Sequence, residues 1–438
     1  MGGDAIFSRH ALLKRAGLPP SKKLLIFFIS AGLLTIPLPH VYNSLTLILF
    51  VAYTLLSYNK ENVKLRPVLM PLLAFFALMV ISAIWSEDIK ATFKALGRES
   101  ALLFIPVAFC LNMQLSKRGV RKILNNYSLM IFLFAVFLMV KAVFRYSNTG
   151  NTEVFFYHEL ATKDISAVYL SVMVAMAAFH FLCKKNKTFW GYLTLLFLMV
   201  FLFLLSSKII ILTSVLLVAA YYVFYSGMGR QFKIIALLVF FGMAGGLGYY
   251  GKISERLATE FQYNSIDNNS AEIHHVSFDE AWNRETFTAN DYLTGTTIRV
   301  YQARIFNEML KEDNIFLTGY GLDASSLHIE RKGVEHNLIH TGEGGITYNK
   351  INFHNQYIES FADLGIFGLL IVVVLLVVNL KNSIKNKEFI HIAFAVLMIS
   401  LFLTESFLWR QRGVVFFTMF YCLFNTGLLP VNKNNRAL

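Results

Sequence analysis

The chain has 438 residues, of which 56% are hydrophobic and 15% charged, and its mean hydropathy is +0.53. Soluble domains carry about 25% charged residues, so this composition excludes an ordinary soluble protein and predicts one embedded in a bilayer. The net charge of +13 does not indicate nucleic-acid binding, because 15 of the 27 acidic residues, against nine Lys and Arg, lie between residues 252 and 353. That segment is net acidic, and the excess positive charge lies elsewhere.

Twelve apolar runs recur along the chain, each close to the roughly 17–25 residues that a helix needs to cross a bilayer. They are residues 24–39, 42–58, 67–86, 100–116, 123–144, 165–183, 188–206, 209–225, 234–250, 358–380, 389–408 and 413–430. The predicted fold class is therefore an all-α polytopic membrane protein with about 12 transmembrane helices and one large, partly helical periplasmic segment between spans 9 and 10.

The predicted regions follow from these runs: a cytoplasmic tail, nine spans, the long polar segment, three spans and a second short tail. Their boundaries are 1–23, 24–251, 252–357, 358–430 and 431–438. The first region carries five Lys and Arg and no small-residue cleavage site, so it is interpreted as a tail and not as a signal peptide. Three cysteines, Cys110, Cys183 and Cys422, fall in apolar runs and predict neither disulfides nor a metal site.

Alternate connections between the runs are rich in Lys and Arg, such as Lys117–Lys122 and Lys381–Lys387. The positive-inside rule places these connections and both termini in the cytoplasm. The intervening connections, including residues 252–357, then face outward.

The long polar segment is expected to hold an amphipathic helix at residues 297–313, because Ile298, Tyr301, Ile305 and Met309 recur at helical spacing. Residues 264–295 and 341–350 are rich in Asn, Ser, Thr and Gly, and no regular structure is expected there.

Ionisable residues gather at the outward ends of the spans, where charge is costly and tends to mark function. They are Lys94, Arg98, Asp164, Lys208, Glu359, Asp363, Glu405, Arg410 and Arg412. Each one alone is as well explained by contact with lipid headgroups or by a neighbouring charge. Together they predict a polar cavity that opens outward between the helices.

The stretch from His354 to Gly368 is the strongest candidate for a site. His354 and Asn355 precede a polar half-turn, and Gly365 and Gly368 open an uninterrupted apolar run. If one helix starts here, Asn355 is its cap and His354 lies at its mouth, where a neutral imidazole can act as a base.

Two other histidines, His336 and His340, stand four residues apart, as zinc ligands on a helix would. The glutamate of an HExxH motif is missing between them. Glycines follow at once, so no continuing helix is expected, and metal binding is not favoured. His336-Asn337 also mimics His354-Asn355, but Thr347 stands at the position equivalent to Gly365, and no apolar span follows it.

The spacing of His354-Asn355 and Gly365-x-x-Gly368 resembles the signature of the O-antigen ligase family, a group of membrane glycosyltransferases of GT-C type. The resemblance covers roughly residues 206–413. In the family an arginine is followed by an aromatic residue, an alanine and then Gly-x-Gly, and here Arg299 stands in that place. The family's serine-arginine pair corresponds to Ser207-Lys208, a departure that keeps the charge but loses the planar fork of arginine.

The resemblance implies His354 as the catalytic base and Arg299, Lys208 and Arg98 as ligands of a substrate pyrophosphate. The supporting residues that it implies are Asn355, Tyr357, Gly365, Gly368, Glu405 and Arg412. Family members use neither a metal nor another cofactor. The implied location is the bacterial cytoplasmic (inner) membrane, with the active site facing the periplasm.

The implied reaction is transfer of a glycan from undecaprenyl pyrophosphate to a sugar hydroxyl of the lipid A-core, with inversion. Two alternatives stay open. The first is an O-antigen polymerase or another oligosaccharyltransferase that uses the same lipid-linked donor. The second is a lipid or polysaccharide transporter or flippase, which would also have many spans and buried charges.

Overall fold

The computed structural model of the protein describes residues 21–112, 114–161, 165–250, 273–342, 345 and 347–428. Most of the first predicted tail, the whole of the second, Asp164 and residues 252–272 lie outside this range. The described chain is almost entirely helical, and its regular β-structure is one pair of two-residue strands.

Each of the twelve predicted apolar runs contains a helix. They are α2 (Lys22–Leu34), α3 (His40–Leu56), α4 (Met70–Ser82), α6 (Ala101–Leu111), α7 (Lys117–Thr149), α9 (Ala167–Cys183), α10 (Phe189–Leu204), α11 (Lys208–Ala220), α12 (Arg230–Tyr250), α17 (Gln356–Asn386), α18 (Phe389–Phe402) and α19 (Gln411–Gly427). A π-helical turn, Tyr221–Tyr225, continues α11.

Within the described residues, four helical stretches are long and apolar enough to cross a membrane. They are Pro67–Ile84, Lys117–Thr149, Lys208–Tyr225 and Gln356–Asn386, and four shorter apolar helices accompany them, namely α3, α9, α10 and α18. The structure therefore confirms an all-helical protein with several candidate spans. The number of twelve spans stays a prediction.

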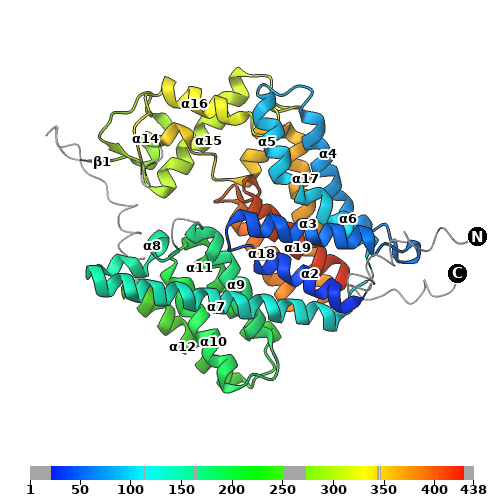
Figure 1. Ribbon diagram of the computed structural model, residues 1–438. Coiled ribbons are helices and arrows are strands. Elements are labelled where there is room, and N and C mark those ends of the chain that lie inside the picture. The colour runs from blue at the N-terminus through cyan, green and yellow to red at the C-terminus, as the bar shows by residue number, and fades with distance from the viewer. Residues whose placement is uncertain are drawn as a thin grey trace, which may run out of the picture.

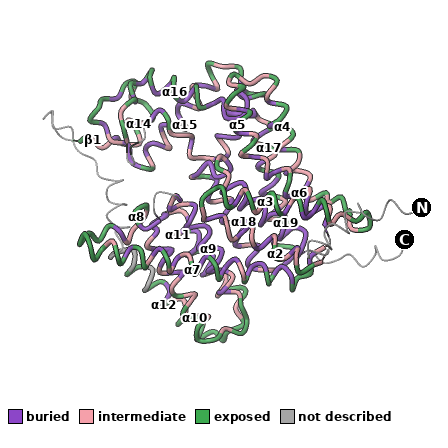
Figure 2. Tube along the Cα trace, viewed as in Figure 1, coloured by how far each residue is buried: buried purple, intermediate pink, exposed green. Residues whose placement is uncertain are grey.

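The bundle is organised around α9 and α19. Nearly every side chain of α9 is buried, and so is α19 from Arg412 to Gly427. Large apolar residues are instead exposed on α7, α10 and α3. Figure 2 colours much of α7 and α10 as exposed. Apolar surface of this extent on helices of this length is what a bilayer would cover.

The sequence analysis did not predict α5 (Ile89–Glu99), which lies in the connection between the apolar runs 67–86 and 100–116. The side chain of Asp88 caps α5 by accepting a hydrogen bond from the N–H of Ala91 (3.0 Å). α5 buries Thr92 and Ala95 and exposes Ile89 and Phe93. Arg98 therefore lies on a helix, where its direction is fixed by helical geometry.

Residues 273–355 form a second part of the molecule, here called the polar lobe, which lies above the bundle in Figure 1. Its helices are α14 (Phe278–Asn283), α15 (Gly295–Glu312) and α16 (Ser325–Glu335). Its strands, β1 (His274–His275) and β2 (Asp291–Tyr292), pair in parallel. The amphipathic helix predicted at 297–313 is thus confirmed as α15.

The expectation of no regular structure at 264–295 is wrong for part of that range, because α14 and the strand pair lie within it. The N-terminus of α14 has a capping box, in which Ser277 and Glu280 each bond to the backbone N–H of the other. α16 was not predicted either. Tyr301 and Ile305 of α15 pack in one core with Ile329 of α16 and with Phe353, next to His354.

The polar lobe is joined to α17 by close backbone contact. α17 breaks at Gly365, which has φ 65°, and a Cβ there would lie 2.2 Å from the carbonyl oxygen of Leu317. Gly319 has φ 66°, and a Cβ on it would lie 2.4 Å from the carbonyl carbon of Asp363. Only glycine permits both the positive φ and this approach. The two segments then share hydrogen bonds, including Tyr320 N–H to the oxygen of Ala362 (2.9 Å).

Candidate functional site

His354 lies at the mouth of α17, as the sequence predicted. Asn355 is the N-cap, and its Oδ1 accepts from the N–H of Tyr357 (3.0 Å) and of Ile358 (3.1 Å). His354 has φ 47°, a left-handed conformation that a histidine adopts at a cost. The cap and the lobe core on either side therefore hold the imidazole in one place.

The partner of His354 is Glu405, in the loop between α18 and α19. The Nδ1 of His354 lies 3.3 Å from Oε2 of Glu405, and the two side chains are 28% and 9% exposed. When Glu405 accepts the Nδ1 proton, the lone pair of the neutral imidazole is on Nε2. Nε2 makes no hydrogen bond to any described residue, so it is available to a substrate.

Arg299 reaches the same loop from the first turn of α15. Its Nε donates to the carbonyl oxygen of Thr404 (3.0 Å), and its Nη1 donates to the carbonyl oxygen of Gly295. Thr404 precedes Glu405, so the predicted cation and the predicted base meet on adjacent residues of one loop.

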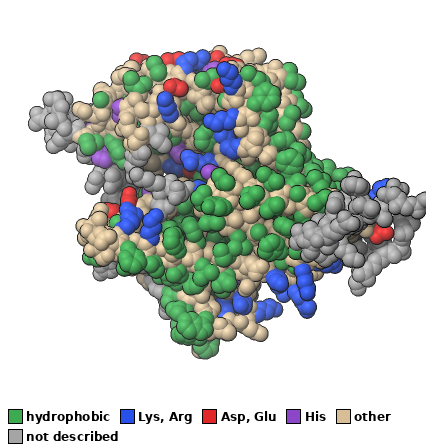
Figure 3. Space-filling view, viewed as in Figure 1, with side chains coloured by type: hydrophobic (Ala, Val, Ile, Leu, Met, Phe, Trp, Pro, Cys, Tyr) green, Lys and Arg blue, Asp and Glu red, His purple; other side chains and the backbone are tan. Residues whose placement is uncertain are grey.

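Basic groups outnumber carboxylates around Glu405. Burial alone would raise the pKa of Glu405, but His354, Arg299 and Arg410 hold it below its usual value. The carboxylate is therefore ionised at neutral pH. One carboxylate faces two guanidinium groups and an imidazole, which leaves net positive charge where an anion would bind. In Figure 3, Lys, Arg and His side chains gather in the recess between the polar lobe and the bundle.

The loop carrying Glu405 is held from several sides. Asn355 donates from its backbone N–H to Oγ of Ser406 (3.2 Å) and from Nδ2 to the carbonyl oxygen of Leu403 (3.2 Å). Gln356 Oε1 accepts from the N–H of Leu408 (2.6 Å). Asn355 thus fixes the start of α17 and the Glu405 loop together.

Lys208 is the first residue of α11, directly after its N-cap Ser207. α11 packs on α18, whose end leads into Thr404 and Glu405, so Lys208 begins its helix at the same end of the bundle. Its role toward a phosphate stays a prediction.

The structure places Arg98 in a different cluster. Its guanidinium lies 3.2 Å from Glu99 Oε1 and 3.5 Å from Asp323 Oδ2, and it covers the ring of Trp409 at 4.8 Å. Trp409 Nε1 also donates to Oδ1 of Asp323 (2.6 Å). Asp323 and Trp409 were not selected from the sequence, because nothing in their spacing indicates contacts with Arg98, which is 225 and 311 positions away from them, respectively.

The remaining motif residues have structural contacts. Tyr357 donates through its hydroxyl to the carbonyl oxygen of Ile399 (3.2 Å), and Arg412 donates to that of Leu38 (3.0 Å). A Cβ on Gly368 would lie 2.3 Å from the carbonyl oxygen of Ser360. Tyr357 therefore connects the start of α17 to α18, Arg412 connects α19 to the segment before α3, and Gly368 permits the close approach within α17 at its break.

The two histidines that resemble a zinc pair have separate partners. His336 Nδ1 lies 3.0 Å from the hydroxyl of Tyr301, whereas His340 Nε2 lies 2.7 Å from the carbonyl oxygen of Asp291. Their ring nitrogens therefore serve different contacts within the polar lobe.

The sequence was compared with models of known protein families. Residues 193–373 match the family model described as O-antigen ligase (Wzy_C). The chain carries an O-antigen ligase domain. No curated protein sequence matches the chain.

The O-antigen ligase domain includes Lys208, Arg299 and His354 together with the glycines of α17. Glu405 and Arg98 lie outside the matched residues, and Glu405 reaches the site only because α18 returns the chain to the mouth of α17. Proteins of this family are membrane enzymes of the O-antigen ligase and polymerase type, and their substrates are lipid-linked glycans.

Proposed function

We propose that the protein is an O-antigen ligase, which transfers a glycan from undecaprenyl pyrophosphate to a sugar hydroxyl of the lipid A-core. The observation that carries the proposal is the pairing of His354 with Glu405 beside Arg299. Glycosyl transfer from a lipid pyrophosphate needs a base for the attacking hydroxyl and cations for the departing diphosphate. This cluster offers both.

In the proposed reaction, Nε2 of His354 takes the proton of the acceptor hydroxyl. The hydroxyl oxygen then forms a bond to the anomeric carbon while the bond from that carbon to the pyrophosphate oxygen breaks. Its electron pair leaves with the carrier diphosphate, and the anomeric configuration inverts. Glu405 orients the imidazole and stabilises the imidazolium that forms.

The departing diphosphate would be neutralised by Arg299, with Lys208 and Arg410. Arg299 and Arg410 both lie close enough to Glu405 to lower its pKa, so they share one small region. Arg98 stays a candidate ligand, although it shares its charge with Glu99 and Asp323. Fixed cations act strongly in a site shielded from water by protein and lipid.

The same site would serve an O-antigen polymerase, since the two enzymes share the donor and differ in the acceptor. A transporter or flippase is less well supported, because the base and the cations converge on one loop at the end of the bundle and not at its middle.

The test is transfer in vitro, with purified protein, lipid-linked glycan and lipid A-core, in the presence of EDTA. General-base catalysis contributes about 10²- to 10⁴-fold, so His354→Ala should lose transfer by that factor per folded molecule. His336→Ala is the matched control and should keep near-normal turnover. Near-normal turnover of His354→Ala would remove the catalytic assignment, and transfer only to a second donor glycan would favour the polymerase.

We further propose that the polar lobe lies in the periplasm and that both termini lie in the cytoplasm, because the Lys- and Arg-rich connections alternate. Reporter fusions at Glu285 and Asn386 should then report opposite sides of the membrane. The same side for both would contradict this topology.

A further inference from the structure

A cavity of about 200 Å³ lies in the polar lobe, and the cations of the proposed phosphate site are not among the residues that line it. α16, the short 3₁₀ turn Tyr348–Lys350 and the loop after it form its walls, and Trp409 contributes from the bundle. Neither Arg299 nor Lys208 lines it. A diphosphate is therefore not the ligand for which this cavity is built.

The polar groups that line the cavity include hydroxyl, amide, carboxylate and ammonium groups. They are Ser326, Glu330, Asn349, Lys350, Asn352 and Glu359. Hydroxyl and amide groups both donate and accept hydrogen bonds, the carboxylates accept, and the ammonium group donates. A ligand that matches this set must itself carry several groups that donate and accept, next to a face that packs on an aromatic ring. A sugar ring has that chemistry.

The cavity is held in shape by contacts of its own. A Cβ on Gly333 of α16 would lie 2.2 Å from Cβ of Asn349, so glycine permits the close approach of the two walls. The hydrogen bond from Trp409 Nε1 to Asp323 and the guanidinium of Arg98 over the ring hold the indole in place. Lys350 Nζ lies 4.0 Å from Glu330 Oε1.

The cavity wall is continuous with the proposed catalytic loop. Asn352, which lines the cavity, accepts through Oδ1 from the backbone N–H of His354 (3.3 Å). Glu359, which also lines it, accepts through Oε2 from the N–H of Phe353 (3.2 Å) and from Oγ of Ser406 (2.8 Å). A group bound in the cavity therefore lies next to the segment that positions His354.

We propose that this cavity is a sugar subsite, which binds one ring of a glycan substrate and so positions the chain for reaction at His354. The proposal rests on the proposed function for the source of the sugar, which is either the acceptor core or the donor glycan. Binding itself is a property of the cavity and can be measured without transfer.

Two tryptophan substitutions on α16 form a matched pair. Leu327 is 47% exposed and lines the cavity, whereas Val334 is 61% exposed and does not. Leu327→Trp should fill the cavity, and Val334→Trp should leave it open. Saturation-transfer NMR on the full-length protein in nanodiscs would use two probes, the deacylated core oligosaccharide and the free glycan released from the donor by mild acid.

We expect one of the probes to bind wild-type protein, His354→Ala and Val334→Trp alike, and to lose about tenfold in affinity in Leu327→Trp and in Lys350→Ala. Binding of the core oligosaccharide identifies an acceptor subsite, and binding of the glycan identifies a donor subsite. No binding of either probe, or equal binding by Leu327→Trp and Val334→Trp, would overturn the proposal.

Kinetics separate this inference from the proposed function. In a protein that transfers glycan, Leu327→Trp should raise the KM of the bound substrate about tenfold while the KM of the other substrate and kcat stay near wild type. Transfer that is absent in wild-type protein, with probe binding intact, would contradict the ligase function and support the subsite. Unchanged KM values for both substrates in Leu327→Trp would contradict the subsite alone.

Discussion

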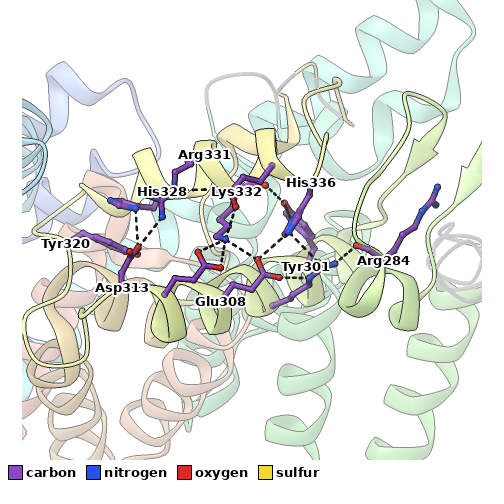
Figure 4. Close-up of polar contacts among 12 residues, drawn as sticks. Arg284, Tyr301, Glu308, Asp313, Tyr320, His328, Arg331, Lys332 and His336 are labelled. Atoms are coloured by element: carbon purple, nitrogen blue, oxygen red, sulfur yellow. Dashed lines mark hydrogen bonds and ion pairs between the residues drawn. The ribbon is translucent and has the colours of Figure 1, made fainter.

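Two clusters of charge, one within the polar lobe and one where the lobe meets the bundle, are built differently. In the first, Lys332 of α16 lies 2.7 Å from Glu312, 2.7 Å from Glu335 and 3.6 Å from Glu308. Figure 4 shows this network between α15 and α16, with His336 and Tyr301 at one end and Asp313 at the other. The side chain of Lys332 is only 4% exposed, and carboxylates surround its charge.

In the second cluster, around His354, basic groups outnumber carboxylates. A single carboxylate, Glu405, faces His354, Arg299 and Arg410, and the imidazole keeps one nitrogen without a partner among the described residues. The network of Lys332 holds two helices together, whereas the cluster at His354 leaves positive charge for a ligand to neutralise. Charge that is fully paired within the fold indicates structure, and unbalanced charge at the mouth of a helix indicates a site.

The strongest test of this difference removes one cation from each cluster. Arg299→Ala should lower turnover by about 10²- to 10³-fold, the loss typical of one fixed group that stabilises developing charge. Arg299→Lys should keep part of the activity, since the charge remains and the planar fork is lost. Turnover per folded molecule is the measurement.

The control for that test is Arg331→Ala. Arg331 lies 3.1 Å from Asp313 and 3.6 Å from Glu335 with its side chain 46% exposed, so its loss should change turnover less than about twofold. Equal effects of Arg299→Ala and Arg331→Ala would show that the two clusters do not differ in function.

A smaller effect is expected from Glu405→Gln, which keeps the shape of the side chain and removes its charge. A hydrogen bond to a charged group contributes about 1.5–3 kcal/mol, which corresponds to roughly 10- to 100-fold in rate. Although burial would raise it, the pKa of Glu405 is held low by its cationic neighbours, so the carboxylate is ionised throughout the neutral range. Protonation of Glu405 itself therefore adds no pH dependence to wild-type turnover between about pH 6 and pH 8. Glu335→Gln should leave turnover near wild type.

The smallest effect on turnover is expected from Lys332→Met, which should instead weaken the packing of α15 on α16. Three partly solvated carboxylates would lose their cation, at a cost of about 1–2 kcal/mol after screening by water. Hydrogen exchange of the amides of α15 and α16 should be faster, with turnover per folded molecule within about twofold of wild type. A large loss of turnover would mean that this network also serves the site.

The pKa shifts in the network of Lys332 predict how protection of the α15 and α16 amides from hydrogen exchange changes with pH. Burial lowers the pKa of Lys332, but Glu312 and Glu335 raise it overall, so its contribution is complete below about pH 10.4 and is lost as pH rises through the folded-state pKa. The hydrogen bond from Lys332 lowers the pKa of Glu335, whose contribution is present above about pH 4.3 and is lost as pH falls further. Burial lowers the pKa of His336 in the same network, so exchange in wild-type protein, corrected for its intrinsic rate, should be constant between about pH 7.5 and pH 9 and should become faster as pH falls below about 6.5.

The sequence predicted the local features of the site. Hydrophobic runs predicted the helices, the spacing of Ile298 to Met309 predicted α15, and the position of Asn355 predicted a helix cap. Each of these depends on residues within a few turns of one another. Such signals are readable because helix periodicity and capping are local properties.

The contacts that turn His354 into a candidate base were not predicted. Glu405 lies 51 residues from His354 in the sequence, and Asp323 lies 225 residues from Arg98. The helix α5 was not predicted, because residues 89–99 lie between two apolar runs and were treated as a connection. Tertiary packing decides these pairings, and one sequence does not contain that information in readable form.

The backbone junction at Gly319 and Gly365 has a consequence for folding of the protein during its synthesis. Residues 319–322 bond to Ala362 and Asp363, and also to Ser82 and Glu87 at the end of α4. The ribosome releases α4 early and α17 only after the whole polar lobe. The backbone N–H groups of Tyr320 and Gly321 therefore cannot form their hydrogen bonds to Ala362 and Asp363 until α17 has been synthesised. Ribosome-bound chains that end before α17 should stay sensitive to protease near Gly319, and chains extended through α17 should become resistant.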